Sequence, residues 1–167
     1  MQRRPLAALQ IRAATLDDLD DLIRVGTETY QEHFSQMWSP AGLEAFLAQH
    51  FGQRAVSVEL CSNTVRYFLA WVDGSDAAVG FAKLRYPKPV PKREHMMGVE
   101  LQKIYLRSSV LTRGVGAQLL AVCEDHTREL GLPVLWLDVL ESNVRAREFY
   151  TRHGFQLAAR LTFDVDL

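Results

Sequence analysis

Between residues 99 and 165 the chain alternates between strand-like and helix-like stretches, and this order constrains the fold more than any other feature of the sequence. The stretches are a strand at 99–107, a helix at 114–131, a strand at 134–139, a short helix at 143–153 and one or two closing strands at 155–165. The apolar run at 134–139 is dense, which is typical of a strand covered on both faces. The alternation predicts a mixed α/β domain whose second half holds any ligand.

The first half of the chain predicts one strand, at least two helices and an antiparallel hairpin. We expect a strand at 9–14, a helix from 15 to about 34, a helix opening at Ser39-Pro40, strands at 65–72 and 77–86, and an exposed proline-rich loop at 87–98. The pattern of residues 53–62 leaves a further short helix open. The four residues 73–76, Asp-Gly-Ser-Asp, separate the two later strands and are typical of a hairpin turn.

Composition and charge exclude several classes of protein. With 167 residues, 48% hydrophobic and 23% charged, the chain fits one globular domain over residues 1–167. Its 19 lysines and arginines against 20 aspartates and glutamates argue against a nucleic-acid partner or an anionic membrane surface. Cys61 and Cys123 lack metal-type spacing, and no apolar run approaches the roughly 18 residues of a membrane span. We therefore expect a cytoplasmic domain without a metal ion.

The most informative segment is the glycine-containing turn between the strand at 99–107 and the helix that follows. Gly114 and Gly116, with Ala117 next, let the backbone approach a ligand, and the helix N-terminus offers unpaired amides with a partial positive charge. Phosphate or pyrophosphate suits such a place, and Arg113 adds a charged donor. The same glycines also suit a tight connection. Leu119 stands where a dinucleotide fingerprint needs its third glycine, which leaves a nucleotide-binding domain as the third interpretation.

A second constellation lies on the short helix at 143–153. At about 100° per residue, Asn143, Ala146, Arg147 and Tyr150 share one face of it. This face suits a groove for an elongated ligand. The alternative is an asparagine N-cap on a helix whose tyrosine packs in the core.

Together the two segments resemble the GNAT superfamily of acetyl-CoA-dependent N-acetyltransferases over roughly residues 65–155. Within it, Glu-Leu-Gln-Lys-Ile-Tyr-Leu at 100–106 and Leu-Trp-Leu-Asp-Val at 135–139 are most similar to the spermidine or polyamine N-acetyltransferase branch. The resemblance implies a mixed, mostly antiparallel central sheet of about six or seven strands flanked by about four helices. It also implies acetyl-CoA as co-substrate and a small-molecule primary amine, polyamines first, as acceptor.

The resemblance also implies roles for individual residues. Tyr150 matches the general acid that protonates the CoA sulfur, Asn143 matches a CoA-contacting position, and Glu100 matches the usual base. The remaining expected cofactor contacts are those along the pantetheine arm, at Ile104, Tyr105 and Leu106, and those around the pyrophosphate, at Leu111, Thr112, Arg113, Gly114, Val115, Gly116 and Ala117. An amide near Leu106 would face the acetyl carbonyl. The alternative for Glu100 is an exposed strand carboxylate.

Two departures from the family pattern and several alternatives accompany this interpretation. Leu111 stands where the family usually has Gln or Arg, and the chain ends at Leu167, so we expect the last strand to be short, absent or supplied by a partner in a homodimer. The alternatives are a protein N-terminal or lysine acetyltransferase and a catalytically silent acyl-CoA-binding regulatory module.

Acidic residues near the expected acceptor entrance could select the substrate. Glu28 and Glu32 lie one helical turn apart, and Asp138 and Glu141 follow the apolar strand. Such a rim would attract polycations, although acids on a helix surface are usually only solvated groups. The loop expected at 87–98 would serve as a lid.

Overall fold

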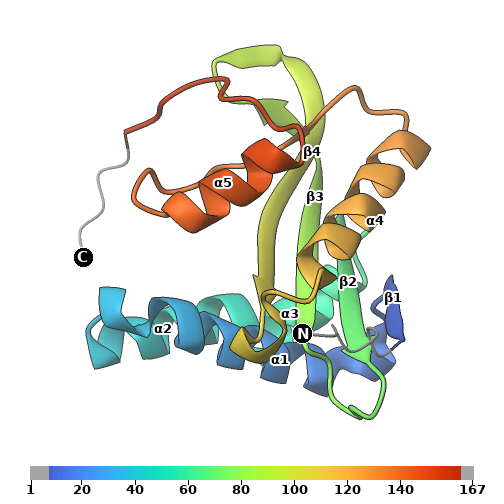
Figure 1. Ribbon diagram of the computed structural model, residues 1–167, viewed down its shortest axis with the longest axis vertical. Helices are drawn as coiled ribbons and strands as arrows, with labels where there is room; N and C mark the ends of the chain where they lie inside the picture. The colour runs from blue at the N-terminus through green and yellow to red at the C-terminus, as the bar shows by residue number, and fades with distance from the viewer. Residues whose placement is uncertain (1–7, 163–167) are drawn as a thin grey trace, which may run out of the picture.

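The computed structural model describes residues 8–162 (Figure 1). It contains a five-stranded sheet in the order β1-β2-β3-β4-β5. The strands are β1 (Leu9–Ala13), β2 (Val65–Val72), β3 (Gly80–Val90), β4 (Arg93–Leu106) and β5 (Leu135–Trp136). Neighbouring strands run antiparallel except β4 and β5, which are parallel. The mixed, mostly antiparallel fold is therefore confirmed, whereas the expected six or seven strands exceed the five present among the described residues.

Helices cover both faces of this sheet. They are α1 (Leu19–Phe34), α2 (Pro40–Phe51), α3 (Gln53–Leu60), α4 (Val115–Glu129) and α5 (Val144–Arg152). Successive side chains of β2 alternate between the faces, so Leu69 packs with α1 and α3, whereas Phe68 packs with α4. The short helix left open at 53–62 is α3, one more helix than expected. No helix in residues 8–162 has both the length and the apolarity to cross a membrane.

The expected loop at 87–98 is wrong, because these residues form the paired ends of β3 and β4. Lys88 faces Gly98, and the turn lies between Val90 and Arg93. Proline has no backbone N–H to donate to a neighbouring strand. It is therefore tolerated in a strand only where no strand lies on that side. The pairing of β2 with β3 stops at Arg85, so the proline-containing end of β3 has β4 as its sole strand neighbour within the described chain.

The expected strand at 134–139 is reduced to two residues. Val99 and Glu100 of β4 pair with Leu135 and Trp136, and beyond them the two strands separate. The apolar run indicated burial on both faces, yet Val139 is 39% exposed. Residues 155–162 form no strand, and the remainder of the predicted closing segment, 163–165, lies outside the described residues.

Candidate functional site

The separation of β4 from β5 leaves one edge of β4 open. The paired residues end at Glu100, whereas β4 continues to Leu106, so its last six residues have β3 but not β5 beside them. Ile104, Tyr105 and Leu106, the predicted pantetheine contacts, lie on this stretch. An open strand edge presents backbone donors and acceptors that can pair with an extended ligand as if it were an added strand.

The predicted anion-binding turn follows directly from the end of β4. Gly114 is the N-cap of α4 and has a φ of 80°, the left-handed conformation that glycine adopts without a steric cost. No side chain caps the helix. Its first i→i−4 hydrogen bond is donated by the Gln118 N–H to the Gly114 carbonyl, at 3.2 Å. The amides of Val115, Gly116 and Ala117 therefore point out of the helix end, as an anion site requires.

Three predicted segments meet at Gly116. A Cβ added there would lie 3.3 Å from Leu106 Cδ1 and 3.4 Å from the Phe149 ring, so glycine allows β4, α4 and α5 to approach each other. Leu111, from the same turn, packs on the core that α4 shares with the sheet. The structure thus brings together the strand end, the turn and the short helix that were predicted separately.

Tyr150 and Asn143 both lie at α5, in different environments. The Asn143 side chain accepts a hydrogen bond from the Ala146 N–H at 3.2 Å, so its amide oxygen serves as the helix cap. Tyr150 packs against the core with its ring 5.5 Å from that of Phe155. Burial, with Cys123 as a second contribution, raises the pKa of Tyr150 to about 12. Its hydroxyl is therefore protonated at neutral pH.

Tyr150 packs on the same core cluster as two residues of the open strand, Leu106 and Ile104. Burial, then Tyr30 and then Tyr150, raise the pKa of Tyr105. The tyrosine on α5 therefore shares a cluster with two of the three predicted pantetheine contacts.

Glu100 lies at the point where β4 and β5 separate. It faces Arg85 on β3 and Trp136 on β5, and its Oε1 is 3.8 Å from the Arg85 Nε. Because a strand rises about 3.3 Å per residue, Glu100 and Leu106 are about 20 Å apart. Glu100 and an amide at Leu106 therefore cannot both contact one acetyl group.

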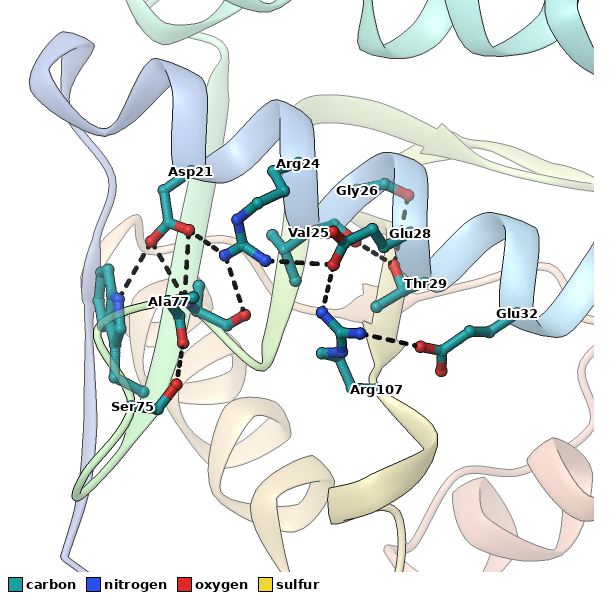
Figure 2. Close-up of polar contacts among 12 residues, drawn as sticks. Asp21, Arg24, Val25, Gly26, Glu28, Thr29, Glu32, Ser75, Ala77 and Arg107 are labelled. Atoms are coloured by element: carbon teal, nitrogen blue, oxygen red, sulfur yellow. Dashed lines mark hydrogen bonds and ion pairs between the residues drawn. The ribbon is translucent and has the colours of Figure 1, made fainter.

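The predicted acidic rim on α1 is largely neutralised (Figure 2). Glu28 and Glu32 both turn toward Arg107, which forms ion pairs with each of them. Glu32 also accepts hydrogen bonds from the Ser108 N–H at 2.8 Å and the Ser108 hydroxyl at 2.7 Å. Partial burial opposes ionisation of Glu32, but Ser108 and Arg107 outweigh it and lower the pKa. These carboxylates hold the strand end in place instead of standing free for a polycation.

The other two predicted rim residues are exposed. Asp138 and Glu141 follow β5, and the Glu141 Oε1 lies 3.8 Å from an Arg160 guanidinium nitrogen. A surface pocket of about 750 Å³ lies between the first turn of α1 and the β2–β3 turn. It contains none of the predicted site residues.

Sequence reasoning missed three basic side chains near β4. His33, at the end of α1, is hydrogen-bonded to the Leu106 carbonyl, and no local sequence pattern predicts that contact. Lys83 and Lys103 are buried in the centre of the sheet. A signal was available for Lys83 alone, because it is the one charged residue in the otherwise apolar run at 80–84, whereas Lys103 lies in a strand with several polar residues.

Comparison with known proteins finds N-acetyltransferases over most of the chain. The sequence model of the acetyltransferase (GNAT) family matches residues 25–155. An uncharacterized N-acetyltransferase encoded in the pepI 3′ region of Lactobacillus delbrueckii subsp. lactis is 30% identical over 149 residues, 89% of this chain and 85% of the relative. The spermidine N(1)-acetyltransferase of Thermoplasma acidophilum is 24% identical over 154 residues, 90% of this chain and 89% of the relative.

Solved structures share the fold. The PaiA N-acetyltransferase of Thermoplasma acidophilum, in complex with coenzyme A, has a TM-score of 0.77 at 21% identity over 90% of this chain and 91% of its own. The aminoglycoside N-acetyltransferase AAC(6')-Iy, in complex with CoA, has a TM-score of 0.73 at 22% identity over 99% of both chains.

Proposed function

Because the chain belongs to the acetyltransferase (GNAT) family, we propose that it transfers an acetyl group from acetyl-CoA to the primary amine of a small molecule. The observation that carries this proposal is the open edge of β4, which leads directly into the uncapped N-terminus of α4. Acetyl-CoA supplies an activated thioester. The open edge of β4 suits the extended pantetheine arm of acetyl-CoA, and the free amides at the start of α4 suit its pyrophosphate.

The amides at 115–117 would hold the pyrophosphate, with Arg113 and Thr112 beside them. Backbone groups of Ile104, Tyr105 and Leu106 would pair with the pantetheine arm. The direct binding of both substrates in one complex needs no covalent enzyme intermediate, because the arrangement aligns donor and acceptor.

The reacting amine must first lose a proton, because a free alkylamine has a pKa of about 10.4. Glu100 would accept that proton directly if the acetyl group lies where β4 and β5 separate, and through water if it lies toward Leu106. As the amine nitrogen forms its bond to the carbonyl carbon, the carbon–sulfur bond breaks, and the second proton that the nitrogen loses to become an amide passes through solvent to the CoA thiolate. The Tyr150 hydroxyl would donate a hydrogen bond to the departing sulfur, and full proton transfer to a less basic thiolate would be uphill.

The acceptor is proposed as a small amine for two reasons. The similarity to a spermidine N(1)-acetyltransferase makes polyamines the first compounds to try, and the fold is shared with an aminoglycoside N-acetyltransferase. The retained tyrosine and carboxylate favour an enzyme over a silent acyl-CoA-binding module.

The test is CoA-thiol release from acetyl-CoA in the presence of spermidine, spermine, small monoamines, amino acids and short peptides. We expect amine-dependent turnover that falls in the Tyr150→Phe variant while acetyl-CoA still binds. Tight acetyl-CoA binding without turnover of any amine would favour the silent module. Preference for peptides would favour the protein acetyltransferase.

A further inference from the structure

Two lysines face each other in the middle of the sheet. Lys83 on β3 and Lys103 on β4 are direct cross-strand neighbours, and they are 4% and 6% exposed. Like charges placed opposite each other across a strand pair destabilise the pair, and burial increases the cost. Such an arrangement requires negative charge nearby.

The chain provides that negative charge for one of the two lysines. Glu59 on α3 forms an ion pair with Lys83 and also accepts a hydrogen bond from the Tyr67 hydroxyl at 3.1 Å. A second carboxylate in this region, Glu100, faces Arg85. This cluster therefore contains three cations and two carboxylates. Glu59 pairs with Lys83 and Glu100 with Arg85, which leaves Lys103 without a carboxylate of its own.

Among residues 8–162, Lys103 forms hydrogen bonds only with neutral groups, and Glu59 and Glu100 act on it without forming an ion pair. Its Nζ donates to the Gln102 Oε1 at 3.3 Å and to the His50 Nδ1 at 3.5 Å, both long for a charged donor. Burial and the nearby Lys103 charge lower the pKa of His50 to about 4, so its ring is neutral. Burial and then Lys83 lower the pKa of Lys103 itself to about 8, which leaves the ammonium mainly charged at neutral pH.

This ammonium lies next to the proposed transfer site. Lys103 is two residues from Tyr105 on the same face of β4, about 7 Å along the strand. Lys103 also lies in the stretch 101–106 of β4 whose edge is open, next to the predicted pantetheine contact Ile104. Its side chain is 6% exposed and bonded to His50 of α2, so an acceptor carboxylate that enters between α2 and β4 would displace His50 to reach it.

We propose that Lys103 binds a carboxylate of the acceptor, so that the preferred substrates are amines that also carry an acid group, as amino acids do. The proposal rests on the acetyltransferase function. A carboxylate would replace the two long neutral contacts with a charge-assisted bond and complete the charge balance of the cluster. A polyamine would bring a further positive charge toward an ammonium that has no ion-pair partner among the described residues.

The experiment compares amines that differ by one carboxylate: putrescine with ornithine, agmatine with arginine, and tyramine with tyrosine. For at least one pair, wild-type kcat/KM should be tenfold or more higher for the acid-bearing member. Lys103→Met should reduce that ratio to near one, mainly through KM. The control Lys92→Met, at an exposed turn, should keep the wild-type ratio.

A second measurement uses only the wild-type protein. A carboxylic acid without an amine, such as 4-methylvalerate, should compete with the acceptor, and its amide should not. Equal or better turnover of the amines without a carboxylate, or a ratio that survives Lys103→Met, would overturn the inference and leave the proposed function standing. Turnover of no amine by a protein that binds acetyl-CoA would overturn both.

Discussion

The Nε2 atom of His33 lies 2.7 Å from the carbonyl oxygen of Leu106, so the last turn of α1 is bonded to the last residue of β4. The N–H of the same peptide unit, from Arg107, donates to the Val79 carbonyl at 2.8 Å. This peptide is therefore held from both sides, immediately before the turn that leads to α4. Because its position sets where the open edge of β4 ends, His33 would act on the proposed acetyl-CoA site through the backbone of β4.

Replacement of His33 with alanine should weaken acetyl-CoA binding. Loss of a hydrogen bond of this kind costs about 1 kcal/mol, which corresponds to a dissociation constant about fivefold higher if the strand end must be reordered on binding. Isothermal titration calorimetry measures this change. His95→Ala, at an exposed position of β4, is the matched control and should bind normally. Equal affinities in the two variants would show that the strand end keeps its position without His33.

Gly114→Ala should weaken acetyl-CoA binding more than it lowers stability. Gly114 has a φ of 80° and open space around a built Cβ, and Gly74 in the β2–β3 turn has a φ of 82° with equally open space. Both alanine variants should therefore lose about 1–2 kcal/mol of unfolding free energy. Relaxation of that strain at Gly114 redirects the amides at the start of α4, whereas at Gly74 it leaves them alone.

Chemical denaturation and calorimetry of the Gly114→Ala and Gly74→Ala variants separate these effects. We expect similar losses of stability, with acetyl-CoA affinity reduced only at Gly114. A parallel loss of affinity at Gly74 would mean that the effect reflects general destabilisation and not the turn.

Local signals in the sequence were sufficient for much of the fold. Ser39 caps α2 through the Gly42 N–H, Asn143 caps α5, and Gly114 adopts the left-handed conformation, each as its residue type indicates. These features depend on a few neighbouring residues, and the backbone obeys the same preferences wherever they occur. The predicted strand-turn-helix segment therefore coincides with the candidate site.

Features that depend on distant partners could not be predicted in this way. Prolines suggested a loop at 87–98. These residues can pair as a hairpin because β2 does not extend beside them, so the prolines need to donate no bond on that side. The acids Glu28 and Glu32 looked free on their helix, and Arg107, about 75 residues later, neutralises them. Their partners become visible only when the strand end packs on α1.

Tyr150→Phe should reduce kcat and leave acetyl-CoA binding nearly unchanged. In the proposed mechanism the hydroxyl donates a hydrogen bond to the departing sulfur, and one preorganised donor to a developing charge contributes about 10²–10³-fold to a rate. The ring keeps its packing against Phe155, so the fold should be retained. CoA-thiol release gives kcat and calorimetry gives the affinity. Tyr86→Phe, whose hydroxyl bonds His126 on α4, is the control for loss of a tyrosine hydroxyl. Undiminished turnover of Tyr150→Phe would remove the residue from the mechanism.

Lys103→Met should stabilise the protein at pH 7. The pKa of Lys103 falls from 10.5 to about 8 on folding, so the folded state disfavours the charged form. Replacement of the buried ammonium with an apolar chain of similar length should raise the free energy of unfolding by about 1–3 kcal/mol. Glu59 keeps its partner Lys83, so no carboxylate is left unpaired.

The difference between wild type and Lys103→Met should depend on pH in one direction. Between pH 8 and about 10.5 the unfolded wild-type chain binds a proton at Lys103 that the folded chain has released, so wild-type stability rises relative to the variant. As pH falls through about 8, that contribution is lost. Urea denaturation at pH 7, 8, 9 and 10 should therefore show the advantage of the variant shrinking, with Lys92→Met showing no such trend. A Lys103→Met variant less stable than wild type at pH 7 would mean that the ammonium has a compensating partner, which would also remove the basis for a carboxylate-bearing acceptor.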